Sequence, residues 1–100
     1  MTAKYFQVIA HYRAQPESVD AVIQHLHELA AATRNEAANL SYEFFQEVDD
    51  PAHIVILERY TDAAGFAAHR DQEHFQRIGL GQIIPRLDSR TVDTFVSAEP

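Results

Sequence analysis

The chain has 100 residues, 46% of them hydrophobic and 23% charged, a balance typical of a folded globular protein, so we expect residues 1–100 to form one domain. Its formal net charge of −7 and its scattered arginines offer no basic stripe for phosphate groups, so a nucleic-acid partner is not expected. The lack of any cysteine excludes disulfides, thiolate catalysis and cysteine-ligated zinc.

The first predicted element is a strand over residues 4–13, where apolar and polar side chains alternate. Gln7, His11 and Arg13 interrupt this segment, which therefore lacks the apolar core of a signal peptide. No apolar run in the chain approaches the ~20 residues that a membrane span needs. We therefore expect a cytoplasmic protein with no membrane partner.

An amphipathic helix is predicted next, over about residues 17–35. Pro16 suits the first position of a helix, and the acidic Glu17 and Asp20 favour its N-terminus. The apolar positions recur at helical spacing. They are Val19, Val22, Ile23, Leu26, Leu29, Ala30 and Thr33.

Two strands follow, LSYEFFQEV over residues 40–48 and HIVILERY over residues 53–60. The sequence Asp49-Asp50-Pro51 between them is a turn signal. Because the connection is short and polar, the two strands are predicted to pair as a hairpin.

The segment after the third strand is predicted to be helical, with Thr61 or Asp62 as the N-cap. Its apolar phase slips, because Phe66 and Phe75 lie nine residues apart, half a turn out of register on one continuous helix. We therefore predict two helical pieces, residues 62–69 and 72–83.

The second of these pieces is predicted to be capped by Asp71 and ended by Pro85. SRTVDTFVS, residues 89–97, is predicted to be the fourth strand. The order β-α-β-β-α-β defines an α+β, ferredoxin-like fold with a four-stranded antiparallel sheet.

The third predicted strand is apolar on both faces, with Ile54, Ile56 and Tyr60 on one side and Val55 and Leu57 on the other. Strand two repeats this pattern. Two helices cover only one face of such a sheet, and an antiparallel sheet with one solvated face alternates cleanly. A second copy of the chain, related by a two-fold axis, is the simplest cover, so we expect an obligate homodimer.

Three segments also resemble a known family: EAANLSYEFFQ at residues 36–46, VILERYTD at 55–62 and AAHRDQEHF at 67–75. They are similar to the antibiotic biosynthesis monooxygenase family. Its pattern is Glu-x-Gly-Asn/Cys-x-x-Tyr at the start of strand two, Glu-x-Trp/Tyr at the end of strand three, and His-x-x-x-x-His-Phe at a helix break. The resemblance runs in order along nearly the whole chain.

This resemblance implies a dimeric α+β barrel, in which two ferredoxin-like units pack sheet to sheet. For the enzymatic members it implies oxidation of hydroquinone-like or polycyclic phenolic substrates by O₂ without metal or flavin, so no cofactor is expected. The family's usual site residues fall here at Asn39, Tyr42, Glu58, Tyr60, His69, His74 and Phe75.

Two positions depart from the family pattern: Ala38 stands where the family usually has Gly, and Tyr60 where Trp is commoner. Related haem-degrading members use an Asn, a Trp and a distal-helix His that ligates the haem. The aligned Trp position here is His69, and the ligand position falls near Gly79. We therefore expect no haem.

We expect His69 to be the catalytic acid/base, because it ends a short helix beside Phe66, where an imidazole can face a cavity and titrate near neutrality. The alternative is a histidine favoured simply by a helix C-terminus. Asn39, Tyr42 and Tyr60 are expected to position a small aromatic substrate by hydrogen bonds and stacking. Buried core tyrosines with satisfied hydroxyls are the alternative.

His74 and Phe75 complete the expected substrate-binding set, although the place of His74 in the first turn of the next helix favours a structural contact. Glu58 is expected to be structural, since a carboxylate among apolar neighbours must be paired or raised in pKa. No metal site is expected, because His25 and His27 point in different directions on their helix and His69 and His74 straddle the break.

The favoured function is thus a cofactor-independent monooxygenase acting on a small hydroquinone or an aromatic polyketide-like substrate. Two alternatives stay open, because a fold does not fix a function. One is a non-catalytic, small-ligand-binding or stress-responsive dimeric barrel. The other is an isomerase of an aromatic-degradation intermediate.

Overall fold

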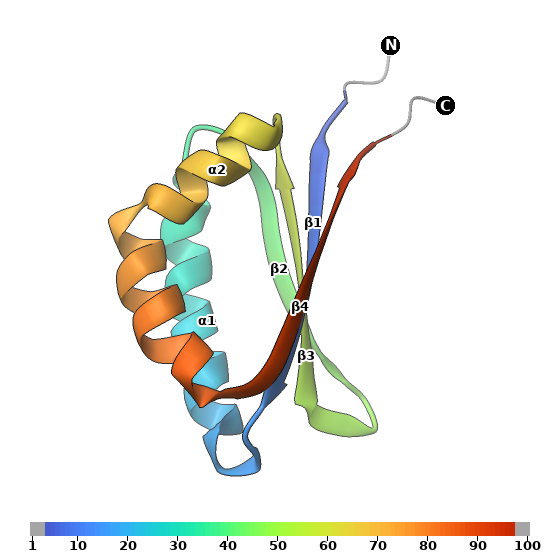
Figure 1. Ribbon diagram of the computed structural model, residues 1–100, viewed down its shortest axis with the longest axis vertical. Helices are drawn as coiled ribbons and strands as arrows, with labels where there is room; N and C mark the ends of the chain where they lie inside the picture. Colours follow the sequence, from blue (N-terminus) through green and yellow to red (C-terminus); the bar gives the residue numbers. More distant parts are fainter. Residues whose placement is uncertain (1–3, 98–100) are drawn as a thin grey trace.

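Four strands form one antiparallel sheet in the order β2-β3-β1-β4 in a computed structural model that describes residues 4–97. The helical segments that follow β1 and β3 both cross the same face of this sheet (Figure 1). This arrangement confirms the predicted ferredoxin-like α+β fold. The strands are β1 (Phe6–Ala14), β2 (Asn39–Glu47), β3 (Asp50–Tyr60) and β4 (Leu87–Val96).

The first helix, α1 (Val19–Thr33), follows a 3₁₀ turn at Pro16–Ser18, so the α-helix begins two residues later and ends two residues earlier than predicted. Its apolar stripe packs against the sheet, with Leu26, Leu29 and Ala30 at most 1% exposed. Beyond its end, the Arg34 guanidinium donates two hydrogen bonds to the carbonyl of Tyr42, at 3.1 and 2.7 Å, and so ties α1 to β2.

β2 and β3 pair as the predicted hairpin, but the turn lies at residues 48–49, so it begins one residue and ends two residues before the predicted 49–51. The register passes from Gln46 opposite Ile54 directly to Glu47 opposite Asp50, which leaves three residues of β3 in a bulge. Pro51 lies in this bulge, where its missing N–H breaks no ladder hydrogen bond, so proline is tolerated inside the strand.

The segment between β3 and β4 begins with α2 (Ala63–Asp71), which is capped by the Asp62 side chain accepting a 2.8 Å hydrogen bond from the Gly65 N–H. Asp71 is the last residue of α2, so the prediction that it caps the following helix is wrong. The break falls at Gln72, whose backbone is extended.

The second predicted helical piece, residues 72–83, is present chiefly as a π-helix, Phe75–Ile83, and a short 3₁₀ turn, Ile84–Arg86, then leads into β4. The Ile84 N–H donates to the carbonyl of Gly79, five residues earlier. Ile78 and Ile83, also five residues apart, are both buried. The wider π turn therefore brings onto one face two apolar side chains that an α-helix would separate.

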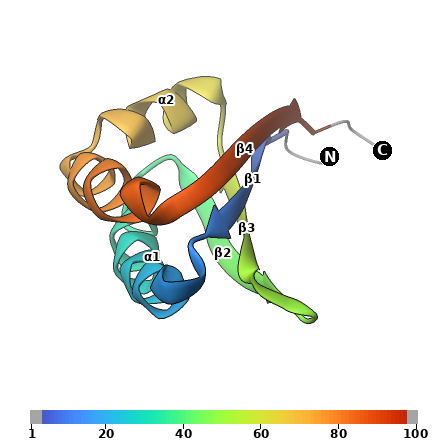
Figure 2. The same cartoon turned by 60° about the horizontal axis from the view of Figure 1, so that its bottom comes forward.

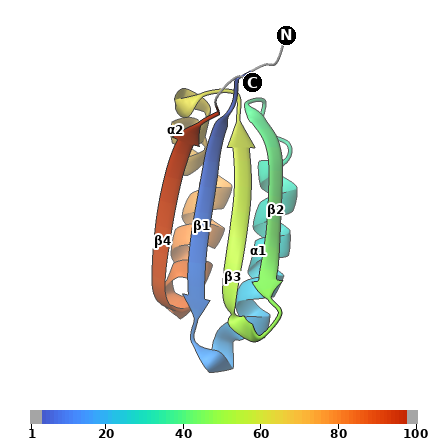
Figure 3. The same ribbon diagram turned by 90° about the vertical axis from the view of Figure 1, so that its right-hand side faces the viewer.

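The two faces of the sheet differ in how they are covered. Val8 and Ala10 of β1 and Ile54 and Ile56 of β3 face the helices and are at most 2% exposed. The opposite face carries no helix among the described residues (Figure 3). Its cross-strand pairs include Ile9 with Leu57 and Phe45 with Val55.

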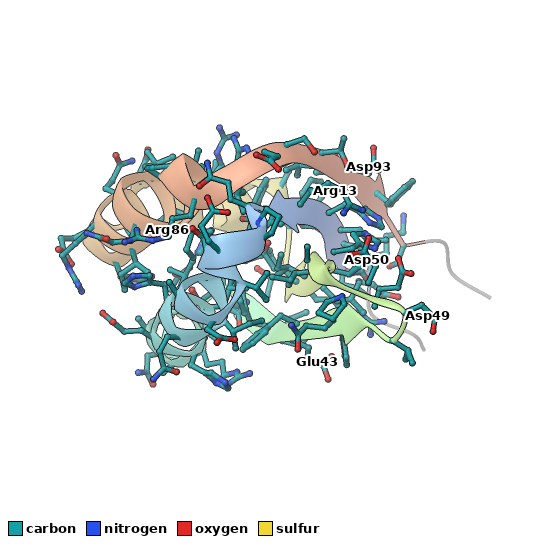
Figure 4. All side chains as sticks on the ribbon, turned by 90° about the horizontal axis from the view of Figure 1, so that it is seen from below. Arg13, Glu43, Asp49, Asp50, Arg86 and Asp93 are labelled. Atoms are coloured by element: carbon teal, nitrogen blue, oxygen red, sulfur yellow. The ribbon has the colours of Figure 1, made fainter. Side chains whose placement is uncertain are left out.

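Phe45 and Phe95 on this uncovered face are 50% and 54% exposed. Charged side chains lie toward its margins, where Arg13 forms a 2.9 Å ion pair with Asp50; Figure 4 shows both on the side of the sheet away from the helices. The sheet is therefore apolar on both faces, as the sequence predicts. Among the described residues, no helix combines the length and apolar character required to cross a membrane.

Candidate functional site

A cavity of about 270 Å³ lies between the helix-covered face of the sheet and the segment that begins with α2. All four strands contribute to its wall, and α2 and Phe75 line the rest of it. Aromatic, acidic, basic and imidazole side chains meet there. The lining residues are Ala10, Tyr12, Tyr42, Glu58, Phe66, His69, Arg70, Phe75, Arg90, Val92 and Thr94.

Glu58 lies on β3 in the inner wall of the cavity and is only 6% exposed. The Tyr60 hydroxyl donates a 2.6 Å hydrogen bond to Glu58 Oε1. Burial raises the pKa of Glu58 to about 7, the Tyr60 hydrogen bond opposes this rise, and the charge of Glu36 adds to it. The carboxyl group can therefore both release and take up a proton near neutral pH.

His69, in the last turn of α2, is held between two carboxyl groups. Its Nδ1 lies 2.9 Å from Glu36 Oε2, and its Nε2 lies 3.7 Å from Glu58 Oε1. Because an ionised carboxylate only accepts hydrogen bonds, Glu36 fixes the imidazole with its proton on Nδ1. Nε2 is left as an acceptor on the side of Glu58 and the cavity.

The same Glu36 oxygen accepts a 2.5 Å hydrogen bond from Nε2 of His74. Burial lowers the pKa of His69, and the hydrogen bond and charge of Glu36 oppose that change. His69 is therefore held as a neutral base with a fixed tautomer, the form needed to remove a proton from a weakly acidic group.

Local chain geometry explains how these residues meet. Glu36 lies in the turn after α1, where its N–H donates to the carbonyl of Thr33 at 2.9 Å. The extended backbone at Gln72 ends α2 and redirects the chain, so His74 returns toward Glu36. The break that was expected to separate the two histidines is what places them on one carboxylate.

The structure places Tyr42, Glu58, His69 and Phe75 on the cavity wall. Burial raises the pKa of Tyr42 well above its ordinary value, as does the charge of Glu58, so its hydroxyl stays protonated and can donate a hydrogen bond.

The other three expected substrate-binding residues do not line the cavity. Asn39 donates from its amide to the carbonyls of Ser41 and Arg59, at 3.1 and 3.4 Å. Tyr60 is fully buried, and its ring centroid lies 5.5 Å from that of His69. His74 lines a separate outer groove together with Glu36.

Sequence reasoning missed Glu36, Tyr12, Arg70 and Arg90. Glu36 opens the family-like segment EAANLSYEFFQ and could have been found from that pattern. Tyr12 shares the inward face of β1 with Ala10, and Arg90 is its cross-strand partner on β4. Burial raises the pKa of Tyr12 to about 12, the charge of Glu58 acts in the same direction, and Arg90 opposes it.

Glu36, His69 and His74 also present ligand atoms within 4.8 Å of one another, the one such group found within residues 4–97. Two imidazoles and a carboxylate suit a divalent transition metal. In this structure the three side chains are joined by hydrogen bonds, with Glu36 Oε2 shared by His69 Nδ1 and His74 Nε2. The expected absence of a metal cofactor stays a prediction.

The fold is that of a ferredoxin-like α+β protein, and the wall of its cavity carries an imidazole–carboxyl pair, His69 and Glu58. The sequence profile described as "Antibiotic biosynthesis monooxygenase" matches residues 6–79, and the chain belongs to that family. The resemblance seen in the sequence is thereby confirmed.

Individual relatives agree with this assignment. The chain is 28% identical over 67 residues, 67% of its length and 70% of the relative's, to "Putative monooxygenase YcnE" from Bacillus subtilis strain 168. A solved structure called an antibiotic biosynthesis monooxygenase matches with a TM-score of 0.87 at 33% identity, over 95% of this chain and 99% of the other. PA3566 from Pseudomonas aeruginosa matches with a TM-score of 0.88 at 26% identity, over 99% of both chains.

Proposed function

We propose that this protein is a cofactor-independent monooxygenase that oxidises a small hydroquinone or aromatic polyketide-like phenol with O₂. The observation that carries the proposal is the meeting of His69 Nε2 and Glu58 Oε1, 3.7 Å apart, in the wall of an aromatic cavity. Family membership supports the reaction class, since the family and its Bacillus subtilis relative carry the name monooxygenase.

The chemistry begins with removal of a phenolic proton by His69 Nε2. The resulting phenolate is electron-rich enough to give one electron to O₂, and the radical pair recombines with a new carbon–oxygen bond as a hydroperoxide. The hydrogen on the oxygenated ring carbon is then lost as a proton while the O–O bond breaks, so one oxygen stays on the ring as a carbonyl and the other leaves as water. The substrate supplies all four electrons, so the reaction balances without an external reductant.

The protein's own residues supply proton transfer and exclusion of water. Glu58, with a pKa of about 7, can return a proton to the departing oxygen while His69 holds the phenolic one. The Tyr42 hydroxyl and the Phe75 ring are proposed to position the substrate from the cavity wall. General acid–base catalysis of this kind contributes about 10²–10⁴-fold to a rate.

Tyr60, Asn39 and His74 are proposed to act from behind this wall. Tyr60 holds the Glu58 carboxyl, and His74 shares Glu36 with His69. Their substitution should therefore change the pH dependence of turnover more than the affinity for substrate.

We also propose that the protein functions as a homodimer whose two sheets pack face to face. The uncovered face presents Ile9, Phe45, Val55, Leu57 and Phe95. Full burial of one such side chain contributes roughly 1.5–3 kcal/mol, so a second copy on this face stabilises both chains.

The test is oxidation of hydroquinones and anthrones under isotope-labelled O₂, using purified protein. One labelled oxygen in the product for each O₂ consumed supports the proposal. An isomerase is the second candidate, because an imidazole–carboxyl pair that moves protons needs no oxygen for that work. A substrate rearranged under strictly anaerobic conditions, with unchanged elemental composition, would favour the isomerase instead.

A further inference from the structure

We infer that the cavity selects aromatic substrates that carry an acidic substituent, such as a carboxylate, which Arg70 and Arg90 hold at its mouth. The inference rests on the proposed function, because it names the substrate class of the same site. Arg70 lies on α2 and Arg90 on β4, two elements that lie near each other at one edge of the sheet (Figures 2 and 3).

The position of the two guanidinium groups follows from the hollows that they border. Arg70, Phe75 and Arg90 line the inner cavity and also a second, more open hollow of about 320 Å³ on its outer side. Both arginines are exposed, whereas His69 is 2% exposed at the inner end. The arginines therefore stand where the cavity meets solvent.

Neither arginine has a carboxylate partner within salt-bridge distance among residues 4–97. Arg70 lies over the Phe66 ring, 5.8 Å from its centroid, and Arg90 lies beside Tyr12. The five remaining arginines of the chain are each engaged by a carboxylate, a carbonyl or a side-chain amide. These are Arg13, Arg34, Arg59, Arg77 and Arg86.

The chain as a whole carries a net charge of −7. The two arginines without a carboxylate, carbonyl or amide partner converge on one cavity, although acidic side chains outnumber basic ones by 15 to 8. The carboxyl groups that border the two hollows are Glu58, at the inner end, and Asp71, at the outer rim. An anionic substituent on a ligand would supply the partner that the chain leaves out.

The charges also fix the direction in which such a ligand enters. A carboxylate at the inner end would meet the Glu58 carboxyl, which repels it whenever Glu58 is ionised. At the mouth the same group meets two guanidinium forks, whose planar donors match a carboxylate. The ring then lies between Phe66 and Phe75, with its phenolic end toward His69.

Cavity size limits the ring system. The volume of about 270 Å³ lies near the lower end of the range for small-molecule sites, which begins at about 300 Å³. One ring or two fused rings with a single carboxylate therefore fit this description better than a large polycyclic compound.

The experiment is anaerobic isothermal titration of matched ligand pairs in which a neutral amide or ester replaces the carboxylate. Suitable pairs are 2,5-dihydroxybenzoate with 2,5-dihydroxybenzamide, and 1,4-dihydroxy-2-naphthoate with its methyl ester. Wild type should bind each acid roughly ten- to a hundredfold more tightly than its neutral partner, the range for hydrogen bonds to a charged group. This preference should shrink as salt concentration rises.

Arg90→Gln and Arg70→Gln should each reduce the preference, and the double variant should abolish it. Arg77→Gln is the control, because it removes the same charge from a site that pairs with Glu73 and Glu28 away from the cavity. Equal binding of acid and neutral partner by wild type, binding of neither at millimolar concentration, or a preference that survives in the double variant would overturn the inference.

The binding experiment needs no turnover, so its result is separate from the fate of the proposed reaction. If the protein binds the acids selectively but never consumes O₂, the proposed monooxygenase reaction is refuted and the proposed anion subsite at Arg70 and Arg90 is supported. If it oxidises neutral and acidic substrates with equal kcat/KM, the proposed reaction is supported and the proposed anion subsite is refuted.

Discussion

Glu36→Gln is expected to lower the stability of the protein and to release the fixed tautomer of His69, because one Glu36 oxygen accepts hydrogen bonds from His69 and His74. The Glu36 side chain is 10% exposed, so solvent screens these contacts little. Hydrogen bonds to a charged group contribute roughly 1.5–3 kcal/mol each. An amide keeps one acceptor and brings two donors, so the free energy of unfolding should fall by about 3 kcal/mol.

Two measurements check this expectation. Urea unfolding gives the change in stability, with Glu28→Gln as the control, because the ion pair of Glu28 with Arg77 is about half exposed and contributes about 0–1 kcal/mol. Nitrogen chemical shifts of the imidazole should show the proton of His69 on Nδ1 in wild type and a mixed tautomer in the variant. A variant within about 1 kcal/mol of wild type, with the tautomer unchanged, would refute the role assigned to Glu36.

Three further changes have expected outcomes of other kinds. Burial raises the pKa of Glu58 from 4.5 to about 7, so the folded protein binds an extra proton between these values. Ionisation of Glu58 should therefore remove about 3 kcal/mol of stability between pH 4.5 and 7. In Glu58→Gln this contribution should be missing from the pH dependence of urea unfolding, and a pH dependence equal to that of wild type would contradict the raised pKa. In Gly65→Ala the new Cβ would lie 2.7 Å from the Ala38 Cβ. This clash should lower the free energy of unfolding, measured by thermal denaturation, by about 1–3 kcal/mol. Adding Ala38→Gly should restore the lost stability if that contact is the cause. Wild type should sediment at twice the chain mass at micromolar concentration. Leu57→Lys should split the dimer or unfold the protein. A folded wild-type monomer would contradict the proposed homodimer.

Local patterns in the sequence predict most of the strands and helical segments of the fold. The alternation of apolar and polar residues in β1 predicts that strand, and the apolar residues on both sides of β3 show that both sheet faces are apolar, because successive side chains on a strand point to opposite faces. The phase slip between Phe66 and Phe75 predicts a break in the second helical segment. The same slip does not reveal a π-helix, since the five-residue spacing of Ile78 and Ile83 becomes meaningful only once the sheet requires both to be buried.

The candidate site was predictable only in part, because the periodicity of a sequence predicts local structure but not which distant residues meet in space. His69 and Tyr42 could be chosen from their motifs, and both line the cavity. Glu36 meets His69 across 33 residues through the turn after α1, a geometry that no spacing rule gives. Arg90 looks like any surface arginine until the β1–β4 register places it opposite Tyr12.

The measurement that bears most directly on the central claim is oxygen uptake by chelator-treated protein supplied with a reactive hydroquinone or anthrone. His69→Gln is compared with His25→Gln, which alters a histidine of α1 outside the cavity. Wild type and His25→Gln should consume O₂ at equal rates, and His69→Gln should lose about a hundredfold or more in kcat/KM, the usual size of a general-base contribution. Uptake no faster than buffer, or an equal rate in His69→Gln, would contradict a reaction driven by the imidazole–carboxyl pair.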